Sequence, residues 1–163
     1  MIEYKKVGLD FATTAPITLE CQAELPVSAE ELFRCFQRSD TWGWASIKSV
    51  EWETPTPYGE GTTRTIETLD QGKVQEYFFL WDDPKRMAFR FERGEMKLVN
   101  AFAENYRVED LGESCRLTWY IGIELRGFFK VLSPILKMVM QRQFASMLDG
   151  LAAYLRDEYK GKE

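Results

Sequence analysis

The sequence contains no histidine. This absence excludes Ser-His-Asp and Cys-His catalysis, and it removes the imidazole ligands of most zinc and iron sites. We therefore expect neither a metal nor another cofactor. The only cysteines are Cys21, Cys35 and Cys115, and none of them forms a C-x-x-C motif. They predict reduced, mostly buried thiols in a cytoplasmic protein.

Extended basic clusters and long apolar runs are also missing. The chain has 21 Lys and Arg against 26 Asp and Glu, a net charge of −5. The nearest basic clusters, at 5–6 and 85–86, are isolated pairs, whereas a nucleic-acid-binding surface needs a broad basic face. Nucleic acid is therefore not an expected partner. No segment approaches the ~20 apolar residues of a transmembrane helix, and the first residues lack the apolar run of a signal peptide.

The hydrophobic pattern that is present changes from alternating to helical along the chain. Apolar and polar residues alternate over 17–25, which predicts a strand with one buried face. Ser28 and Glu31 then form a capping box that predicts a short helix, and 39–46 reads as a second short helix or a loop. Six further strands are predicted, at 47–54, 62–69, 73–81, 86–92, 98–109 and 114–125.

The last predicted element is a long helix. Ser133 is its candidate N-cap, Pro134 stands in its first turn, and an apolar stripe runs from Leu136 to Leu155. Residues 1–16 show no clear period and are interpreted as an N-terminal extension of undetermined order before a single domain at 17–160.

This order predicts an α+β domain. Short links between consecutive strands favour antiparallel pairing. We expect a seven-stranded curved antiparallel sheet wrapped around the C-terminal helix, with two short helices between strands 1 and 2.

Three ionisable residues interrupt the apolar inner face of this sheet. A tight turn at 70–72 pairs Thr68 with Val74 and makes Arg64 and Glu76 diagonal neighbours. A turn at 111–112 pairs Asp110 with Glu113 and places Glu104 on the inner face of the last hairpin. A buried unpaired charge costs several kcal/mol. Two interpretations stay open: an internal ion pair that fixes the register, or the polar end of a binding cavity.

Three motifs and the order of elements resemble a known superfamily. The motifs are the glycine-rich stretch 59–64 that ends in Arg64 and is followed by Glu76, the Trp-Asp-Asp-Pro stretch 81–84, and the stretch 113–119 that ends in Arg-Leu-Thr-Trp. Over residues 17–158 the chain resembles the START-like or SRPBCC superfamily, and within it the polyketide cyclase/dehydrase and lipid-transport type. The resemblance implies a helix-grip fold with a deep cavity for an apolar molecule between the sheet and the C-terminal helix. It carries over no catalytic residue.

The inner faces and the closing helix together predict the wall of this cavity. The expected ligand-binding residues are Arg64, Ile66, Glu76, Phe78, Phe89, Phe102, Glu104, Tyr106, Trp119, Met140, Phe144 and Met147.

Three functions are compatible with this wall. The first, which we favour, is binding or transport of a small hydrophobic ligand, lipid or polyketide-like. The second is a metal-free polyketide cyclase/aromatase or dehydratase that uses Glu104, Tyr106 and Arg64, because burial against Trp119 would raise the pKa of the Glu104 carboxyl toward that of a general base. The third is a protein-interaction module without a ligand. A homodimer is left open.

Two apolar stretches outside the wall have alternative interpretations. Trp42 and Trp44 either pack against the end of the sheet, which we favour, or stack on a flat ligand. Residues 127–132 either form an extra helical turn, slightly preferred, or an exposed patch at the cavity mouth that touches a membrane or a partner.

Overall fold

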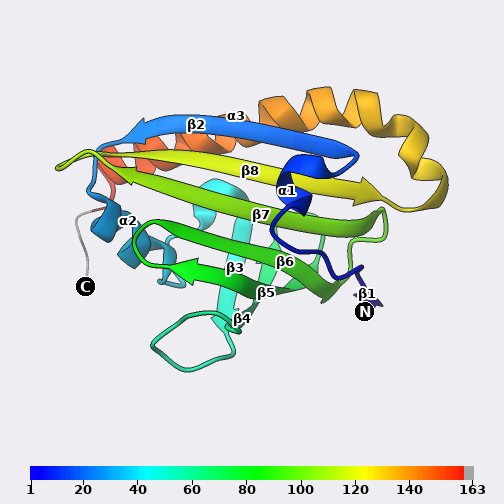
Figure 1. Ribbon diagram of the computed structural model, residues 1–163, viewed down its shortest axis with the longest axis horizontal. Coiled ribbons are helices and arrows are strands. Elements are labelled where there is room, and N and C mark those ends of the chain that lie inside the picture. The colour runs from blue at the N-terminus through cyan, green and yellow to red at the C-terminus, as the bar shows by residue number, and fades with distance from the viewer. Residues whose placement is uncertain (160–163) are drawn as a thin grey trace.

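The computed structural model describes residues 1–159 and confirms the α+β prediction (Figure 1). A long helix lies along one side of an antiparallel sheet, one short helix (α1) packs across β8, and another (α2) lies beyond the end of β2. The strands are β1 (Ile2–Glu3), β2 (Ile17–Leu25), β3 (Ile47–Trp52), β4 (Thr63–Thr68), β5 (Lys73–Asp82), β6 (Arg86–Gly94), β7 (Val99–Asp110) and β8 (Cys115–Leu125). The helices are α1 (Phe11–Thr14), α2 (Ala29–Phe36), η1 (Gly43–Ala45), η2 (Gly127–Leu132) and α3 (Ser133–Asp157).

The seven predicted strands are all present and follow the spatial order β2-β8-β7-β6-β5-β4-β3. Both predicted hairpins, however, pair two residues away from the expected register. Arg64 lies directly opposite Glu76 rather than diagonal to it, and Asp110 lies opposite Cys115 rather than Glu113. The centre of each turn lies one residue away from its expected position, but the resulting two-residue shift in pairing leaves every side chain on the same face of its strand. The predicted assignment of side chains to the inner face is therefore correct, although the predicted pairing is not.

The helical insert between β2 and β3 also follows the prediction. Ser28 caps α2, and its Oγ accepts a hydrogen bond from the Glu31 backbone N–H at 3.2 Å. The second short helix is a single 3-10 turn, η1. The prediction that Ser133 caps α3 is wrong, because η2 runs directly into α3. Ser133 Oγ instead donates to the Lys130 carbonyl.

The closing helix α3 is buried only in its C-terminal half. Phe144, Leu148, Leu151 and Leu155 are its buried residues, and the helix packs mainly against β2 and η1. Its first ten residues have no fully buried side chain, and they extend toward the end of the molecule that lies away from α2 (Figure 1). Within residues 1–159, every helix is too short or too polar to span a lipid bilayer.

The N-terminal residues, predicted as an extension of undetermined order, form β1 and α1. Ile2 pairs with Gly94 of β6, and the Tyr4 and Lys5 backbone N–H groups donate to carbonyls of β6 and β7. The Tyr4 hydroxyl accepts from the Met96 backbone N–H at 2.9 Å and donates to the Met96 carbonyl at 3.2 Å. The start of the chain thus fastens the loop between β6 and β7.

Helix α1 packs on β8 at a position that only glycine allows. A Cβ added to Gly122 would lie 2.4 Å from the Phe11 carbonyl oxygen. The division of the chain at residue 16 stays a prediction, and residue 160, its predicted end, lies outside the described residues.

Candidate ligand-binding cavity

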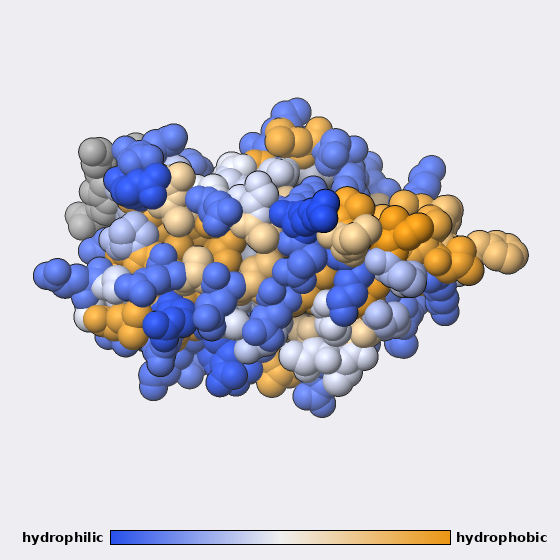
Figure 2. All heavy atoms as spheres, turned by 90° about the horizontal axis from the view of Figure 1, so that it is seen from above, coloured by the Kyte–Doolittle hydropathy of each residue, from blue (hydrophilic) through white to orange (hydrophobic). Residues whose placement is uncertain are grey.

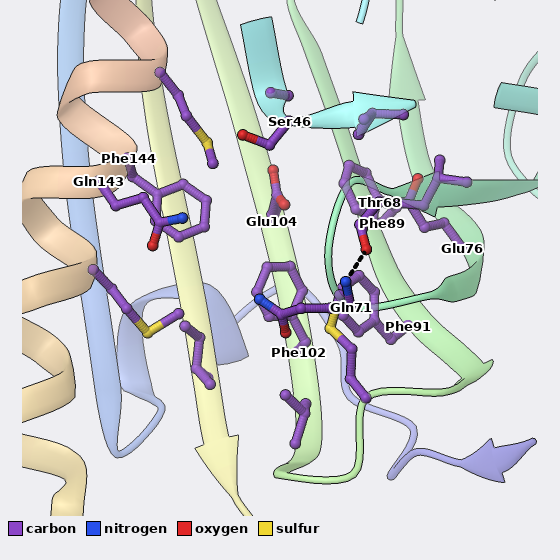
Figure 3. A pocket seen from close by; sticks show the side chains of 18 of the residues that line it. Ser46, Thr68, Gln71, Glu76, Phe89, Phe91, Phe102, Glu104, Gln143 and Phe144 are labelled. Atoms are coloured by element: carbon purple, nitrogen blue, oxygen red, sulfur yellow. Dashed lines mark hydrogen bonds between the residues drawn. The ribbon is translucent and has the colours of Figure 1, made fainter. Parts of the chain in front are cut away.

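A cavity of about 290 Å³ lies between the sheet and α3. This volume is at the lower end of the range of about 300–1,000 Å³ for small-molecule sites. Figure 3 shows Phe144 and Gln143 of α3 on one side, Phe89 and Glu76 on the other, and Glu104 between them.

The structure brings eleven of the twelve predicted residues to the cavity wall. These are Arg64, Ile66, Glu76, Phe89, Phe102, Glu104, Tyr106, Trp119, Met140, Phe144 and Met147. The placement of Phe78 in the wall is wrong. Its ring is fully buried and stacks on Trp52, with Trp81 and Phe89 at its edges. Phe78 therefore forms a layer behind the wall.

Sequence analysis missed much of the wall near the cavity mouth. Phe91, Ile123 and Leu125 also line the cavity, and simple alternation from Phe89 and Trp119 could have found them. Met96 and Leu98 line it as well, but they lie in a loop, where no periodicity marks the direction of a side chain.

One end of the cavity is polar and holds a buried ion pair. Arg64 is fully buried, and its Nε donates to Glu76 Oε2 at 2.5 Å. The guanidinium carbon lies 4.2 Å from the ring centroid of Trp42, a cation–π contact. Nη1 and Nη2 of Arg64 are buried without a hydrogen-bond partner. Burial raises the pKa of Glu76, and the Arg64 guanidinium opposes that rise.

Glu104 is the second acid at this end, and it is 8% exposed. Its Oε1 accepts hydrogen bonds from the Tyr106 hydroxyl at 2.7 Å and from Trp119 Nε1 at 2.6 Å. Burial raises the pKa of Glu104 to about 8, and the nearby Glu76 carboxylate adds to the rise, while the two hydrogen bonds and Arg64 oppose it. The carboxyl is therefore mainly protonated at pH 7.

The hydrogen bonds indicate which oxygen of Glu104 carries the proton. Burial, followed by the adjacent Glu104, raises the pKa of Tyr106 well above its ordinary value, so the phenol stays neutral and donates. Because Oε1 accepts two hydrogen bonds, it acts as the carbonyl oxygen, and the proton belongs on Oε2. No residue within 1–159 forms a hydrogen bond with Oε2. The polar end therefore combines a protonated Glu104 oxygen with the buried Arg64 guanidinium, whose carbon lies within 4.2–5.4 Å of the rings of Trp42, Trp52, Phe78 and Phe89. A donor beside a positive charge suits an oxygen acceptor.

Aromatic side chains fill the space beside this polar end. Trp42 stacks on Phe36 and Trp44, and Trp44 in turn contacts Trp119. The Nε1 of Trp42 also donates to backbone carbonyls of Phe36 and Arg38. These contacts support the interpretation of the tryptophans as packing residues, although Trp42 also reaches the cavity wall.

The opposite end of the cavity reaches the surface. Gln71, Leu98, Val139 and Gln143 line the cavity and are exposed. We call the opening between these residues the mouth. Within residues 1–159, no group of three or more Cys, Asp or Glu side chains is placed to hold a metal ion.

Comparison with known families fits this geometry. The model of the polyketide cyclase / dehydrase and lipid transport family matches residues 16–156. The chain belongs to this family. Members related in sequence are uncharacterized proteins of Mycobacterium tuberculosis and Mycobacterium bovis, each 36% identical over 148 residues that cover 87% of this chain and 89% of the relative.

Solved structures with the family's fold are more distant in sequence. A START superfamily protein from Mycobacterium smegmatis superimposes with a TM-score of 0.73 at 13% identity, over 88% of this chain and 99% of that chain. An aromatase/cyclase from a Streptomyces species gives 0.63 at 16% identity, over 85% and 93%. Norcoclaurine synthase from Thalictrum flavum gives 0.62 at 18% identity, over 88% and 94%. These similarities show the shared helix-grip fold, which is used by enzymes and by other proteins.

Proposed function

We propose that this protein binds a small, mostly apolar molecule that carries an oxygen acceptor at one end. The observation that supports the proposal is an apolar cavity that ends at unpaired donors. Two guanidinium nitrogens of Arg64 are buried without partners, and such groups cost free energy until an acceptor reaches them. A ligand carbonyl, enol or carboxyl oxygen at the polar end would satisfy them, while its apolar part occupies the wall of Ile66, Phe102 and Met140.

Native mass spectrometry of the protein purified from its own host tests the proposal. We expect a retained molecule with at least one carbonyl-type oxygen. Ile66→Trp and Met140→Trp place a large ring in the cavity from the sheet and from α3, and both should remove the bound mass. Leu111→Trp adds the same ring to the exposed β7–β8 turn and should keep it. Equal bound mass in all four proteins would place the ligand elsewhere, and a pure hydrocarbon would contradict the role of Arg64.

A second candidate function is acid–base catalysis on such a ligand. The supporting observation is Glu104, whose pKa of about 8 allows it to exchange a proton near neutral pH. Next to Arg64, it could donate a proton to a carbonyl oxygen or remove one from carbon, as a cyclase or dehydratase requires. If Glu104→Gln retains the ligand and abolishes its conversion, catalysis is supported. If the bound molecule is unchanged by the wild-type protein, binding alone remains.

The third function, an interaction module without a ligand, receives no support from the cavity. Such a module would have aromatic rings throughout the space under α3. The aromatic packing around Trp119 instead stops at the polar end, and about 290 Å³ beside it stays open.

A further inference from the structure

The start of α3 and the turn before it expose an unusual number of large apolar side chains. Phe128 is 93% exposed, Val131 77% and Ile135 60%. We call these residues, together with Phe129, Leu132 and Met138, the apolar cap. Figure 2 shows apolar side chains gathered at one end of the molecule, where η2 and the start of α3 project. Contiguous apolar patches of this kind mark interaction sites.

The charged residues of the segment that carries the apolar cap all have one sign. Arg126, Lys130, Lys137 and Arg142 lie between 126 and 148, and all 26 acidic residues of the chain lie outside that segment. None of the salt bridges found within residues 1–159 includes a basic residue of this segment. A locally basic, phenylalanine-bearing helix start therefore sits on a chain with a net charge of −5.

This combination favours an anionic lipid surface over a second copy of the chain. Two apolar caps in contact would bring two sets of unpaired cations together, which opposes dimerisation. A helix with exposed apolar residues and flanking lysines suits the bilayer interface, where rings insert among the acyl chains and ammonium groups meet anionic headgroups. The cap also projects from the body, so it can reach a flat surface.

The apolar cap adjoins the mouth of the cavity. Leu136 and Val139 of α3 line the cavity, and both lie within one helical turn of Ile135 and Met138. A bilayer in contact with the cap would therefore lie beside the opening through which a ligand enters. This position adds to the proposed function but does not depend on it, because docking can be measured without knowing the ligand.

We propose that residues 126–139 dock this protein on the surface of an anionic lipid bilayer. The test is flotation of the full chain with phosphatidylcholine vesicles, with and without phosphatidylglycerol. We expect binding to the anionic vesicles only, and weaker binding as salt is raised.

The apolar contribution is tested by a matched pair of variants. Phe129→Ser and Leu111→Ser each remove one apolar side chain of similar exposure, 43% and 41%, at opposite ends of the molecule. We expect Phe129→Ser, and Phe128→Ser still more, to weaken vesicle binding about tenfold, since each ring would be partly inserted. Leu111→Ser should bind as the wild type does. All three residues are at the surface, and circular dichroism checks that the variants fold.

The charge contribution is tested in the same assay. Lys130→Gln and Lys137→Gln should each weaken binding about fivefold, whereas Lys85→Gln, in the β5–β6 turn, should have no effect. Three outcomes would overturn the proposal: no binding to anionic vesicles, equal losses in the control variants, or a concentration-dependent dimer that Phe128→Ser dissociates. The last outcome would identify a second copy as the partner of the cap.

Discussion

Replacing Glu104 by glutamine should stabilise the folded protein at neutral pH. The fold raises the pKa of this carboxyl from 4.5 to about 8. Between these values the unfolded chain has lost the proton while the folded chain still holds it, so unfolding releases a proton and stability falls as the pH rises. Within that window, each pH unit lowers the unfolding free energy of the wild type by about 1.4 kcal/mol. Glutamine has no proton to lose, and its oxygen can still accept from Tyr106 and Trp119.

The size of the effect follows from the width of the window. From pH 4.5 to pH 7 the wild type should lose about 3 kcal/mol of unfolding free energy relative to Glu104→Gln. Above about pH 8, where both states of the wild type are ionised, the difference should level off. Urea unfolding followed by tryptophan fluorescence at a series of pH values measures it. Glu60→Gln, in the exposed loop before β4, serves as the control and should run parallel to the wild type. A pH-independent difference between Glu104→Gln and the wild type would show that the buried acid is not held protonated.

Three further predictions concern stability. Arg64→Met should cost about 3–5 kcal/mol in urea unfolding, because it leaves Glu76 buried without its counterion; adding Glu76→Leu should recover most of that loss. Gly122→Ala should cost about 1–3 kcal/mol through the clash with the backbone of α1, and hydrogen exchange should rise at residues 1–16 rather than in the central strands. Ser28→Ala should cost about 1 kcal/mol through loss of the α2 cap; a change under a few tenths would contradict the role of that hydroxyl.

The fold was predictable from sequence because alternating apolar and polar residues mark both the strands and the face that each strand buries. Glu104 and Tyr106 were placed on the inner face although the pairing of their hairpin was wrong by two residues, because faces depend only on parity. For the same reason Arg64 and Glu76 were expected to meet, and they do. The exact partners across a hairpin depend on which residue lies at the centre of its turn, and the sequence at 70–72 and 111–112 placed that centre one residue away from where it lies.

Other features depend on contacts between distant segments and left no local pattern. Phe78 was assigned to the cavity by alternation, and it does share the buried face of Val74 and Glu76. The rings of Trp52, Trp81 and Phe89 surround it, however, and no local pattern predicts these contacts. The stacking of Arg64 on Trp42 joins residues from β4 and the η1 region. The N-terminal residues carry no period because they are held from outside, by β6, β7 and β8.

The hydrogen bonds between Tyr4 and Met96 connect the start of the chain to the wall of the cavity. Met96 and Leu98 belong to the wall, so the two hydrogen bonds of Tyr4 hold part of the cavity wall in place. A modification or fusion that displaces the first five residues would remove the support of this part of the wall, although none of those residues lines the cavity itself.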